Sequence, residues 1–416
     1  MPELITFRNF HYKEAKEKGP ERLAELVAPP YDVISEKEKE ELKNKDPNNI
    51  CHVILPDSYE LAGKKLNQMI ENGILVHGER RCLCIYGIDY KRPDTGEKIS
   101  RYGFVGLLKL VDIFPPSIRQ GVIPHEMTFR KYTEDRFNLI KHTDCNFSPI
   151  FMIYNGKGVA GELFKKYVNT EPFLQTRDRD GFLHKIWEVY DEEDIKKYQE
   201  IIKSHPVIIA DGHHRFQTCL WHSKNEGCKY IMALFIDFND PGLIIYTSHR
   251  QIHRLFANSI EEIKKKVLNH FETRDIENVE EMKKIMQENR EEHVFGCYFL
   301  NRYIFFKLKE HVKPEELVPN NNSKEWKNLN LPILHYILFK DLGIEKEDIT
   351  FVKGVKNGLE NVDKGEVKAL FIVNPTTLEE VHKITELGEI MPQKSTYFYP
   401  KPLSGLIIHK HTNKIE

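Results

Sequence analysis

The sequence predicts an α/β fold with mixed sheets (α+β in its arrangement), and three observations lead to this prediction. Helix-like and strand-like segments alternate along the whole chain. The run from His205 to His222 has the pattern of a buried strand, a sharp turn at Asp211 and Gly212, and a helix. Hydrophobic residues make up 40% of the 416 positions, which is enough for two or three packed cores.

The N-terminal half is predicted to mix helices and strands. Ser35 and Glu38 form a capping box that begins a charged helix. The turn formers at 93–96 separate two strand-like runs, which predicts a long β-hairpin. The predicted elements of this half are a helix from 35 to about 45, a strand over 50–55, hairpin strands over 81–90 and 100–111, a strand over 150–154 and a helix over 191–204.

The C-terminal half continues the alternation. Ser259 and Glu262 form a second capping box, and Pro332 suits the first turn of another helix. The polar stretch 309–328 predicts a linker or an exposed loop. The predicted elements are strands over 207–210, 231–238, 243–247 and 369–373, and helices over 215–224, from 259, over 332–342 and over 377–387.

Composition excludes several classes of protein. Lys plus Arg number 61 against 63 Asp plus Glu, so no strong field attracts nucleic acid. The longest apolar runs are far shorter than the roughly 18 residues of a membrane span, and the N-terminus lacks a signal-peptide pattern. The seven cysteines include no CxxC pair. We therefore expect a cytoplasmic protein that binds neither nucleic acid nor membranes; its oligomeric state stays open.

The densest polar cluster is Asp211 to Arg215 at a predicted strand end. Glycine allows a tight turn, and the helix N-terminus, the histidines and the arginine supply donors that suit phosphate. A solvated turn without function is the alternative. A zinc site built from His213, His214, Cys219 and His222 fits no common zinc spacing.

Three further groups carry polar side chains next to prolines or apolar residues. The pair His125 and Glu126 follows an apolar run, so its carboxylate could act as a general base or lie on the surface. Tyr31 and Asp32 follow two prolines and could line a pocket or merely turn the chain. The block 391–400 contains Lys394, Ser395 and Thr396, but it lacks the frame of a phosphate-binding P-loop. Its three aromatic residues could equally pack a domain interface.

Taken together, these groups resemble a known family. PPYDV at 29–33, PHEMT at 124–128, ADGHHR at 210–215 and MPQKSTYFYPKPLSGL at 391–406, with three other boxes between them, are similar to the family known as domain of unknown function one thousand and fifteen. The other boxes are PNNICHVILP at 47–56, RYGFVGLLKL at 101–110 and FSPIF at 147–151.

The central segment also resembles the free serine kinases of the ParB and sulfiredoxin-like fold. The order of elements in that group is matched by His125 and Glu126, Arg136 and Leu139, Pro149 and Ile150, and Asp211 to Arg215. The resemblance implies that Glu126 is the base acting on the serine hydroxyl and that the DGHHR turn holds the donor phosphates. The insert between Ile150 and Val207 is longer than in the compact kinases.

These implications give a complete set of expectations. The catalytic residues would be Glu126, His125 and Asp211; the phosphate donor would be bound by Gly212, His213, His214, Arg215, Lys394, Ser395 and Thr396; and the substrate pocket would include Tyr31, Asp32, Thr128 and Arg136. The expected domains are an α/β unit over 1–115, a ParB/sulfiredoxin-like catalytic core over 116–240, and a second α/β unit over 241–416 that contributes to the site.

The expected activity is phosphorylation of free L-serine to O-phospho-L-serine with Mg²⁺ and a phosphoanhydride donor. Pyrophosphate is slightly favoured over ATP or ADP because no adenine-binding motif is recognisable. Two alternatives stay open: a phosphoesterase or nuclease that uses the same loop, and a nucleotide-binding regulatory module.

Overall fold

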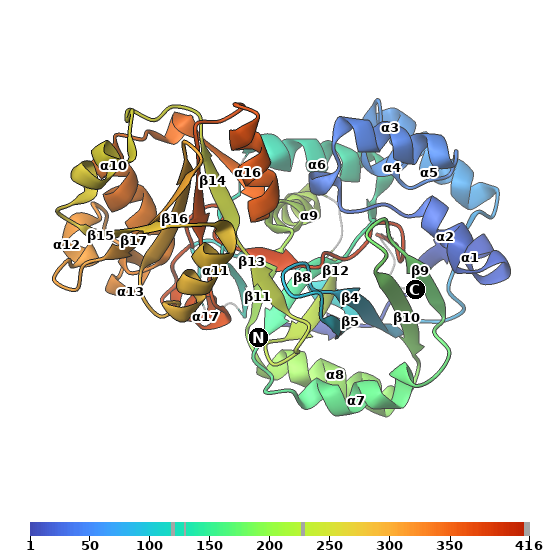
Figure 1. Ribbon diagram of the computed structural model, residues 1–416. Helices are drawn as coiled ribbons and strands as arrows, with labels where there is room; N and C mark the ends of the chain where they lie inside the picture. Colours follow the sequence, from blue (N-terminus) through green and yellow to red (C-terminus); the bar gives the residue numbers. More distant parts are fainter. Residues whose placement is uncertain (118–120, 129, 226–228, 412–416) are drawn as a thin grey trace. The chain divides into compact units, whose positions relative to one another are not determined.

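The computed structural model describes residues 1–117, 121–128, 130–225 and 229–411. The chain divides into two compact units (Figure 1). The first unit comprises Met1–Ile244 and the segment that starts at Pro400, and the second comprises Ile245–Tyr399. The expected boundary at 240/241 lies close to this division. The expected boundary at 115/116 falls inside the first unit, because strands from both sides of it pair in one sheet.

Within the described residues, a nine-stranded mixed sheet forms the centre of the first unit. Its order is β6 (Val122–Pro124), β11 (Val207–Asp211), β8 (Ile150–Tyr154), β12 (Tyr230–Asp237), β5 (Lys98–Lys109), β4 (Leu83–Lys91), β10 (Leu183–Val189) and β9 (Leu174–Arg177), with β1 (Leu4–Ile5) beside β5. The pairs β6–β11 and β8–β12 are parallel, and the other pairs are antiparallel. The predicted α/β class, the β4–β5 hairpin and the strands at 150–154 and 207–210 are confirmed.

Helices cover this sheet because each presents one apolar face to it. The helices α7 (Val159–Val168) and α8 (Glu192–Ser204) lie side by side along the sheet (Figure 1). Phe164 and Tyr198 from these helices join Phe104 and Tyr154 from the strands in one buried cluster. The predicted helix at 191–204 is confirmed, and Asp191 caps it by accepting the backbone N–H groups of residues 193 and 194.

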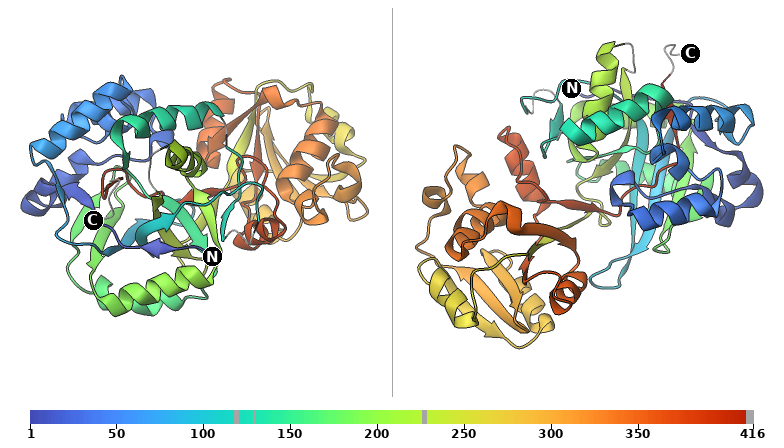
Figure 2. Two further views of the ribbon diagram at one scale, coloured as in Figure 1. Left: turned by 180° about the vertical axis from the view of Figure 1, so that it is seen from behind. Right: turned by 90° about the horizontal axis from the view of Figure 1, so that it is seen from above.

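The first 77 residues add mainly helices, drawn in blue in Figure 2. They are α1 (Lys13–Lys18), α2 (Pro20–Leu26), α3 (Glu36–Lys45), α4 (Cys51–Ile54) and α5 (Tyr59–Glu71), with a short 3-10 turn at Tyr31–Val33 and a strand pair of β2 (Phe10–Tyr12) and β3 (Leu75–His77). The predicted capping box of Ser35 and Glu38 is confirmed.

The strand predicted over 50–55 is wrong, because this segment forms helix α4. A short apolar run does not distinguish a buried strand from a buried helix turn. Asn49 stabilises the start of this helical turn: its Oδ1 accepts the backbone N–H of Cys51 over 2.8 Å. Its Nδ2 donates to the carbonyl oxygens of Glu25 and Val27 over 2.6 and 3.2 Å.

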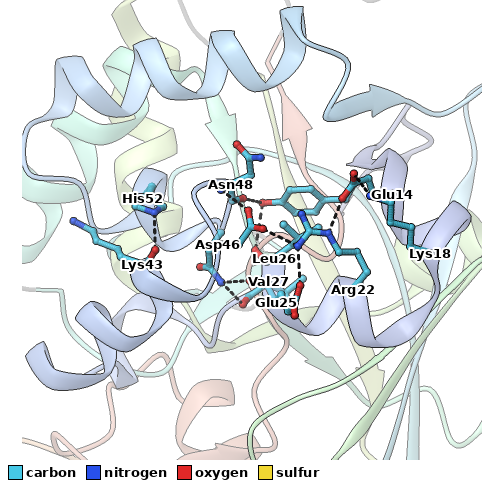
Figure 3. Close-up of polar contacts among 12 residues, drawn as sticks. Glu14, Lys18, Arg22, Glu25, Leu26, Val27, Lys43, Asp46, Asn48 and His52 are labelled. Atoms are coloured by element: carbon cyan, nitrogen blue, oxygen red, sulfur yellow. Dashed lines mark hydrogen bonds and ion pairs between the residues drawn. The ribbon is translucent and has the colours of Figure 1, made fainter.

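A polar network fixes the end of α2 just before the PPYD segment (Figure 3). Arg22 pairs with Glu14 at 2.6 Å and with Glu25 and Asp46 at 2.7 Å each. The Tyr12 hydroxyl donates to the carbonyl oxygen of Asn48 over 2.8 Å. These contacts position the chain that leads to Tyr31 and Asp32.

The second unit is built on a six-stranded antiparallel sheet. Its order is β15 (Phe271–Ile276), β17 (Arg302–Leu308), β16 (Val294–Phe299), β19 (Ala369–Val373), β14 (Ser248–Ile252) and β18 (Ile349–Lys353). The helices of this unit include α10 (Ile260–Val267), α11 (Val279–Glu288), α16 (Val355–Asp363) and α17 (Leu378–Glu386). Two short strands, β13 (Ile244–Tyr246) and β20 (Tyr397–Tyr399), pair with each other. The predicted strand over 369–373 and the predicted helices from 259 and over 377–387 are confirmed.

The stretch 309–328 is not the exposed linker that its polarity predicted. It contains the short helices α12 (Pro314–Leu317) and α13 (Lys324–Lys327). Trp326 is buried, and its indole nitrogen donates to the carbonyl oxygen of Ile390 over 2.7 Å. The predicted helix after Pro332 is present, as α14 (Asn330–Ile333), a π-helical turn (Leu334–Leu338) and α15 (Phe339–Leu342). Across the described part of the chain, no helix has both the length and the apolar character to cross a membrane.

Candidate active site

Two of the polar groups singled out in the sequence meet at one edge of the first sheet. β6 and β11 are parallel neighbours, with Val122 opposite Val207 and Pro124 opposite Ile209. Their carboxyl ends therefore lie side by side. His125 and Glu126 follow β6 directly, and the DGHHR turn follows β11. In α/β sheets, ligands bind at the carboxyl ends of strands.

His213, the first residue of α9 (His213–Asn225), joins the two groups. Its Nε2 accepts the backbone N–H of His125 and the backbone N–H of Glu126, each over 3.2 Å. An imidazole nitrogen that accepts hydrogen bonds is unprotonated, so this histidine is neutral with its proton on Nδ1. Burial lowers the pKa of His213 well below its ordinary value, and the neighbouring His125 lowers it further. His213 thus fixes the backbone that carries Glu126.

His125 is fully buried beside it. Its Nδ1 lies 2.5 Å from the carbonyl oxygen of Ile209, and its ring meets the edge of the His213 ring at 4.7 Å between centroids. Burial lowers the pKa of His125. The ring therefore orients the loop after β6, while the neighbouring Glu126 is only partly buried.

The DGHHR turn needs glycine at its second position. Gly212 has φ +98°, and a Cβ there would lie 2.8 Å from Cδ1 of Ile150 and 2.9 Å from a terminal nitrogen of Arg215. Arg215 ties the turn to the start of β8. It donates to the carbonyl oxygens of Ser148 and Pro149 over 3.2 and 3.1 Å, to the Ser148 hydroxyl over 2.7 Å and to Asp211 over 3.0 Å.

Lys401, which the sequence analysis did not include in the site, connects Asp211 to the PPYD segment. Its Nζ lies 2.6 Å from Asp211 Oδ1 and 2.6 Å from Asp32 Oδ2, and its side chain is 8% exposed. Burial lowers the pKa of Lys401, but the two carboxylates outweigh it and raise the pKa above its ordinary value. Burial raises the pKa of Asp211, but Lys401 and Arg215 together hold it below its ordinary value.

Tyr31 and Arg136 lie together at a small pocket of the same unit. The guanidinium of Arg136 stacks over the Tyr31 ring at 4.1 Å from the centroid, and it donates to the carbonyl oxygen of Ile54 over 2.9 Å. Burial raises the pKa of Tyr31 to about 12. Arg215, Ser148 and Thr218 line the same pocket.

The other predicted site residues lie as follows. His214 is partly buried in the first turn of α9, and Thr128 is partly buried between β6 and α6 (Arg130–Thr143). Lys394 and Ser395 belong to the second unit. Lys394 is exposed at φ +57°, and its carbonyl oxygen accepts from Arg250 over 3.4 Å. Thr396 follows them in the same unit. The contacts described for Lys394 and Ser395 lie within that unit.

The residues of this site do not form a ready metal site. In the part of the chain that the structure describes, no three histidine, cysteine, aspartate or glutamate side chains gather as metal ligands would. Both Asp211 oxygens are already paired, one with Lys401 and one with Arg215. Mg²⁺ prefers free carboxylates together with substrate phosphates. The DGHHR turn therefore offers it no free carboxylate.

Comparison with known proteins identifies the family. The family model described as "Protein of unknown function (DUF1015)" matches residues 4–331. The chain belongs to the DUF1015 family. This DUF1015 protein is also 25% identical over 190 residues to an ATP-dependent L-serine kinase of Staphylothermus marinus. That match covers 45% of this chain and 65% of the relative, slightly less than two thirds of its length.

Solved structures show a distant likeness to this DUF1015 protein. A variant of a free serine kinase in complex with AMP is 17% identical, with a TM-score of 0.35, over 68% of this chain and 88% of that one. A conserved hypothetical protein from Pyrococcus furiosus is 16% identical, with a TM-score of 0.33, over 68% of this chain and 90% of that one.

Proposed function

We propose that this DUF1015 protein is a kinase that phosphorylates free L-serine to O-phospho-L-serine. One observation carries the proposal: His213 of the DGHHR turn binds the backbone N–H groups of both His125 and Glu126. The residue that bears the proposed base, Glu126, and a turn suited to phosphate thus follow neighbouring strand ends, those of β6 and β11. Phosphoryl transfer to a hydroxyl needs these two parts next to each other.

In the proposed reaction, Glu126 accepts the proton of the serine hydroxyl as the oxygen attacks the terminal phosphorus of the donor. The bond between that phosphorus and the bridging oxygen breaks. The bridging oxygen leaves with the rest of the donor, which has one phosphate fewer than before. The backbone N–H groups at the start of α9, with His214, face the phosphate charge. Arg215 holds the turn through its hydrogen bond to Ser148, and glycine at 212 leaves the space that a Cβ would take from Ile150.

For the donor, we propose a phosphoanhydride, with ATP tested first. The Staphylothermus marinus relative is named as ATP-dependent, and this favours ATP over the pyrophosphate suggested by the missing adenine motif. Mg²⁺ would travel with the donor phosphates, and no step here depends on a protein ligand for it.

The test is product analysis. The purified protein is incubated with L-serine, Mg²⁺ and one of ATP, ADP or pyrophosphate, and phosphoserine is measured by mass spectrometry. Phosphoserine should form with at least one donor and should depend on serine. Release of phosphate at an equal rate without serine would instead assign the site to hydrolysis. The absence of phosphoserine with all three donors, from folded protein, would refute the proposal.

A further inference from the structure

Arg101 in β5 is a buried cation whose hydrogen-bonding groups are unused. The residue is 1% exposed and lies opposite Ile88 of β4. Both terminal nitrogens of its guanidinium lack a hydrogen-bond partner among the described residues. Buried polar groups are nearly always paired, and a guanidinium carries five donors in a planar fork. An unpaired fork in the interior of a protein calls for an explanation.

The polar groups around Arg101 already have other partners. The Tyr86 hydroxyl lies 2.9 Å from Nδ1 of His184 and 3.0 Å from the backbone nitrogen of Leu403. The Tyr90 hydroxyl donates to the carbonyl oxygen of Gly242 over 3.0 Å. The two oxygens of Asp240 accept the backbone N–H groups of Tyr102 and Gly242. Asp240 therefore attracts Arg101 through its charge but accepts no hydrogen bond from the terminal guanidinium nitrogens.

The fork lies close to the candidate active site. The Arg101 guanidinium stacks over the Phe151 ring at 4.7 Å from the centroid. Phe151 is the register partner of Asp211 across β8 and β11. Leu403, which binds Tyr86, comes two residues after Lys401, the partner of Asp211. The unused donors thus belong to the part of the first unit that holds Asp211 and Lys401.

We propose that Arg101 binds the carboxylate of a small amino-acid substrate, which is free L-serine if the proposed function holds. A carboxylate accepts two parallel N–H groups from one guanidinium. Such bidentate pairing would give each terminal nitrogen of Arg101 the hydrogen-bond acceptor that it lacks. The negative charge of Asp240 disfavours a phosphate, which carries more charge than a carboxylate. Burial raises the pKa of Asp240 to about 6, so this carboxyl is mostly ionised at neutral pH.

The identity of the ligand as L-serine rests on the proposed function. The test measures binding only, so it does not require the protein to be active as a kinase. L-serine is titrated into wild-type protein and into Arg101→Met by calorimetry, and ethanolamine is titrated as the same molecule without its carboxylate. Wild-type protein should bind L-serine at least tenfold more tightly than ethanolamine, and Arg101→Met should lose that preference. Inorganic phosphate should bind both proteins alike.

Two further variants keep the test decisive. Arg101→Lys keeps the charge but loses the fork, so it should also bind L-serine more weakly, and it serves if Arg101→Met does not fold. Arg250→Met removes the other large, fully buried arginine, which lies in the second unit, and should leave L-serine affinity unchanged. Equal affinity of wild-type protein for L-serine and ethanolamine, or full L-serine affinity in both Arg101 variants, would overturn the inference. Serine binding through Arg101 without phosphoserine formation would refute the kinase proposal alone.

Discussion

His213 Nε2 and the backbone N–H of Glu126 are joined by a hydrogen bond of 3.2 Å. The two residues are far apart in the sequence, and this contact holds the backbone of Glu126 beside the DGHHR turn. It also means that Glu126 can be altered without disturbing the link, because the bond uses backbone and not side chain.

Glu126→Gln should therefore separate chemistry from folding. Glutamine keeps the size of the side chain but does not take the serine proton. We expect turnover to fall by roughly 100-fold to 10,000-fold, the usual effect of losing a general base. Steady-state kinetics measure this, with a melting curve to confirm that the fold is intact. Near-normal turnover would move the role of base to Asp211 or Asp32.

Gly212→Ala should damage the turn itself. The new Cβ would clash with Ile150 and Arg215 at a backbone angle of +98° that alanine rarely adopts. We expect a lower melting temperature and loss of activity. Gly161→Ala is the matched control, since nothing lies within 4 Å of its Cβ position in helix α7. An unchanged melting temperature for Gly212→Ala would show that the turn relaxes without cost.

Lys401→Met should destabilise the protein because it leaves Asp32 and Asp211 without their shared cation. Breaking a fully buried ion pair costs about 3–5 kcal/mol. The cost here is smaller, because Asp32 is 41% exposed and Asp211 keeps Arg215. Urea unfolding monitored on wild-type protein and variant gives the difference. Equal stability of the two proteins would mean that the ion pairs contribute nothing.

Lys394→Ala tests the block 391–400, whose part in catalysis is still a prediction. Lys394 is exposed, so its loss should leave the melting temperature nearly unchanged. If its ammonium reaches a substrate phosphate or carboxylate, turnover should fall. Comparing the turnover of Lys394→Ala with that of Lys401→Met shows which of the two lysines contributes to catalysis. A normal rate for Lys394→Ala would assign the block to structure.

Stability should fall on acidification partly because of His249. Its Nδ1 accepts the backbone N–H of Val373 over 3.3 Å. Burial, with the charge of Arg250, lowers its pKa from 6.5 to about 4. Between these values the unfolded chain binds more protons than the folded one, so stability decreases as pH falls through this range.

At pH 5 this histidine alone accounts for about 2 kcal/mol relative to neutral pH. His249→Asn, whose oxygen accepts the same N–H, should lose less stability than wild-type protein between pH 7.5 and pH 5. His253→Gln, at an exposed position, should keep the full loss. Parallel losses in all three proteins would exclude His249 as a contributor.

Local sequence patterns were sufficient to predict most of the elements that carry the site. The apolar run before Asp211, the glycine after it and the periodic helix beyond gave β11, the turn and α9 close to their observed bounds. Patterning succeeds there because the spacing of buried residues and the turn chemistry lie within one short segment. The boundary at 115/116 depended instead on pairing between β5 and β12, which no local pattern records.

Lys401 was missed for a related reason. Its neighbours in the sequence are prolines, which suggest a stiff loop, and its two carboxylate partners lie in segments far along the chain. The family box at 391–406 contains Lys401, but Lys394, next to two hydroxyl residues, is the more conspicuous cation in it. Only the three-dimensional structure shows that Lys401 is the lysine that forms an ion pair with Asp211.

The position of Lys401 along the chain also affects biosynthesis. The second unit interrupts the first, so the segment from Pro400 is translated after all of Ile245–Tyr399. While the ribosome makes the second unit, the nascent first unit has its sheet strands but lacks Lys401, and Asp32 and Asp211 have no shared ammonium. The first unit can therefore reach its final form only after the second unit has been translated, even though most of its strands emerge earlier.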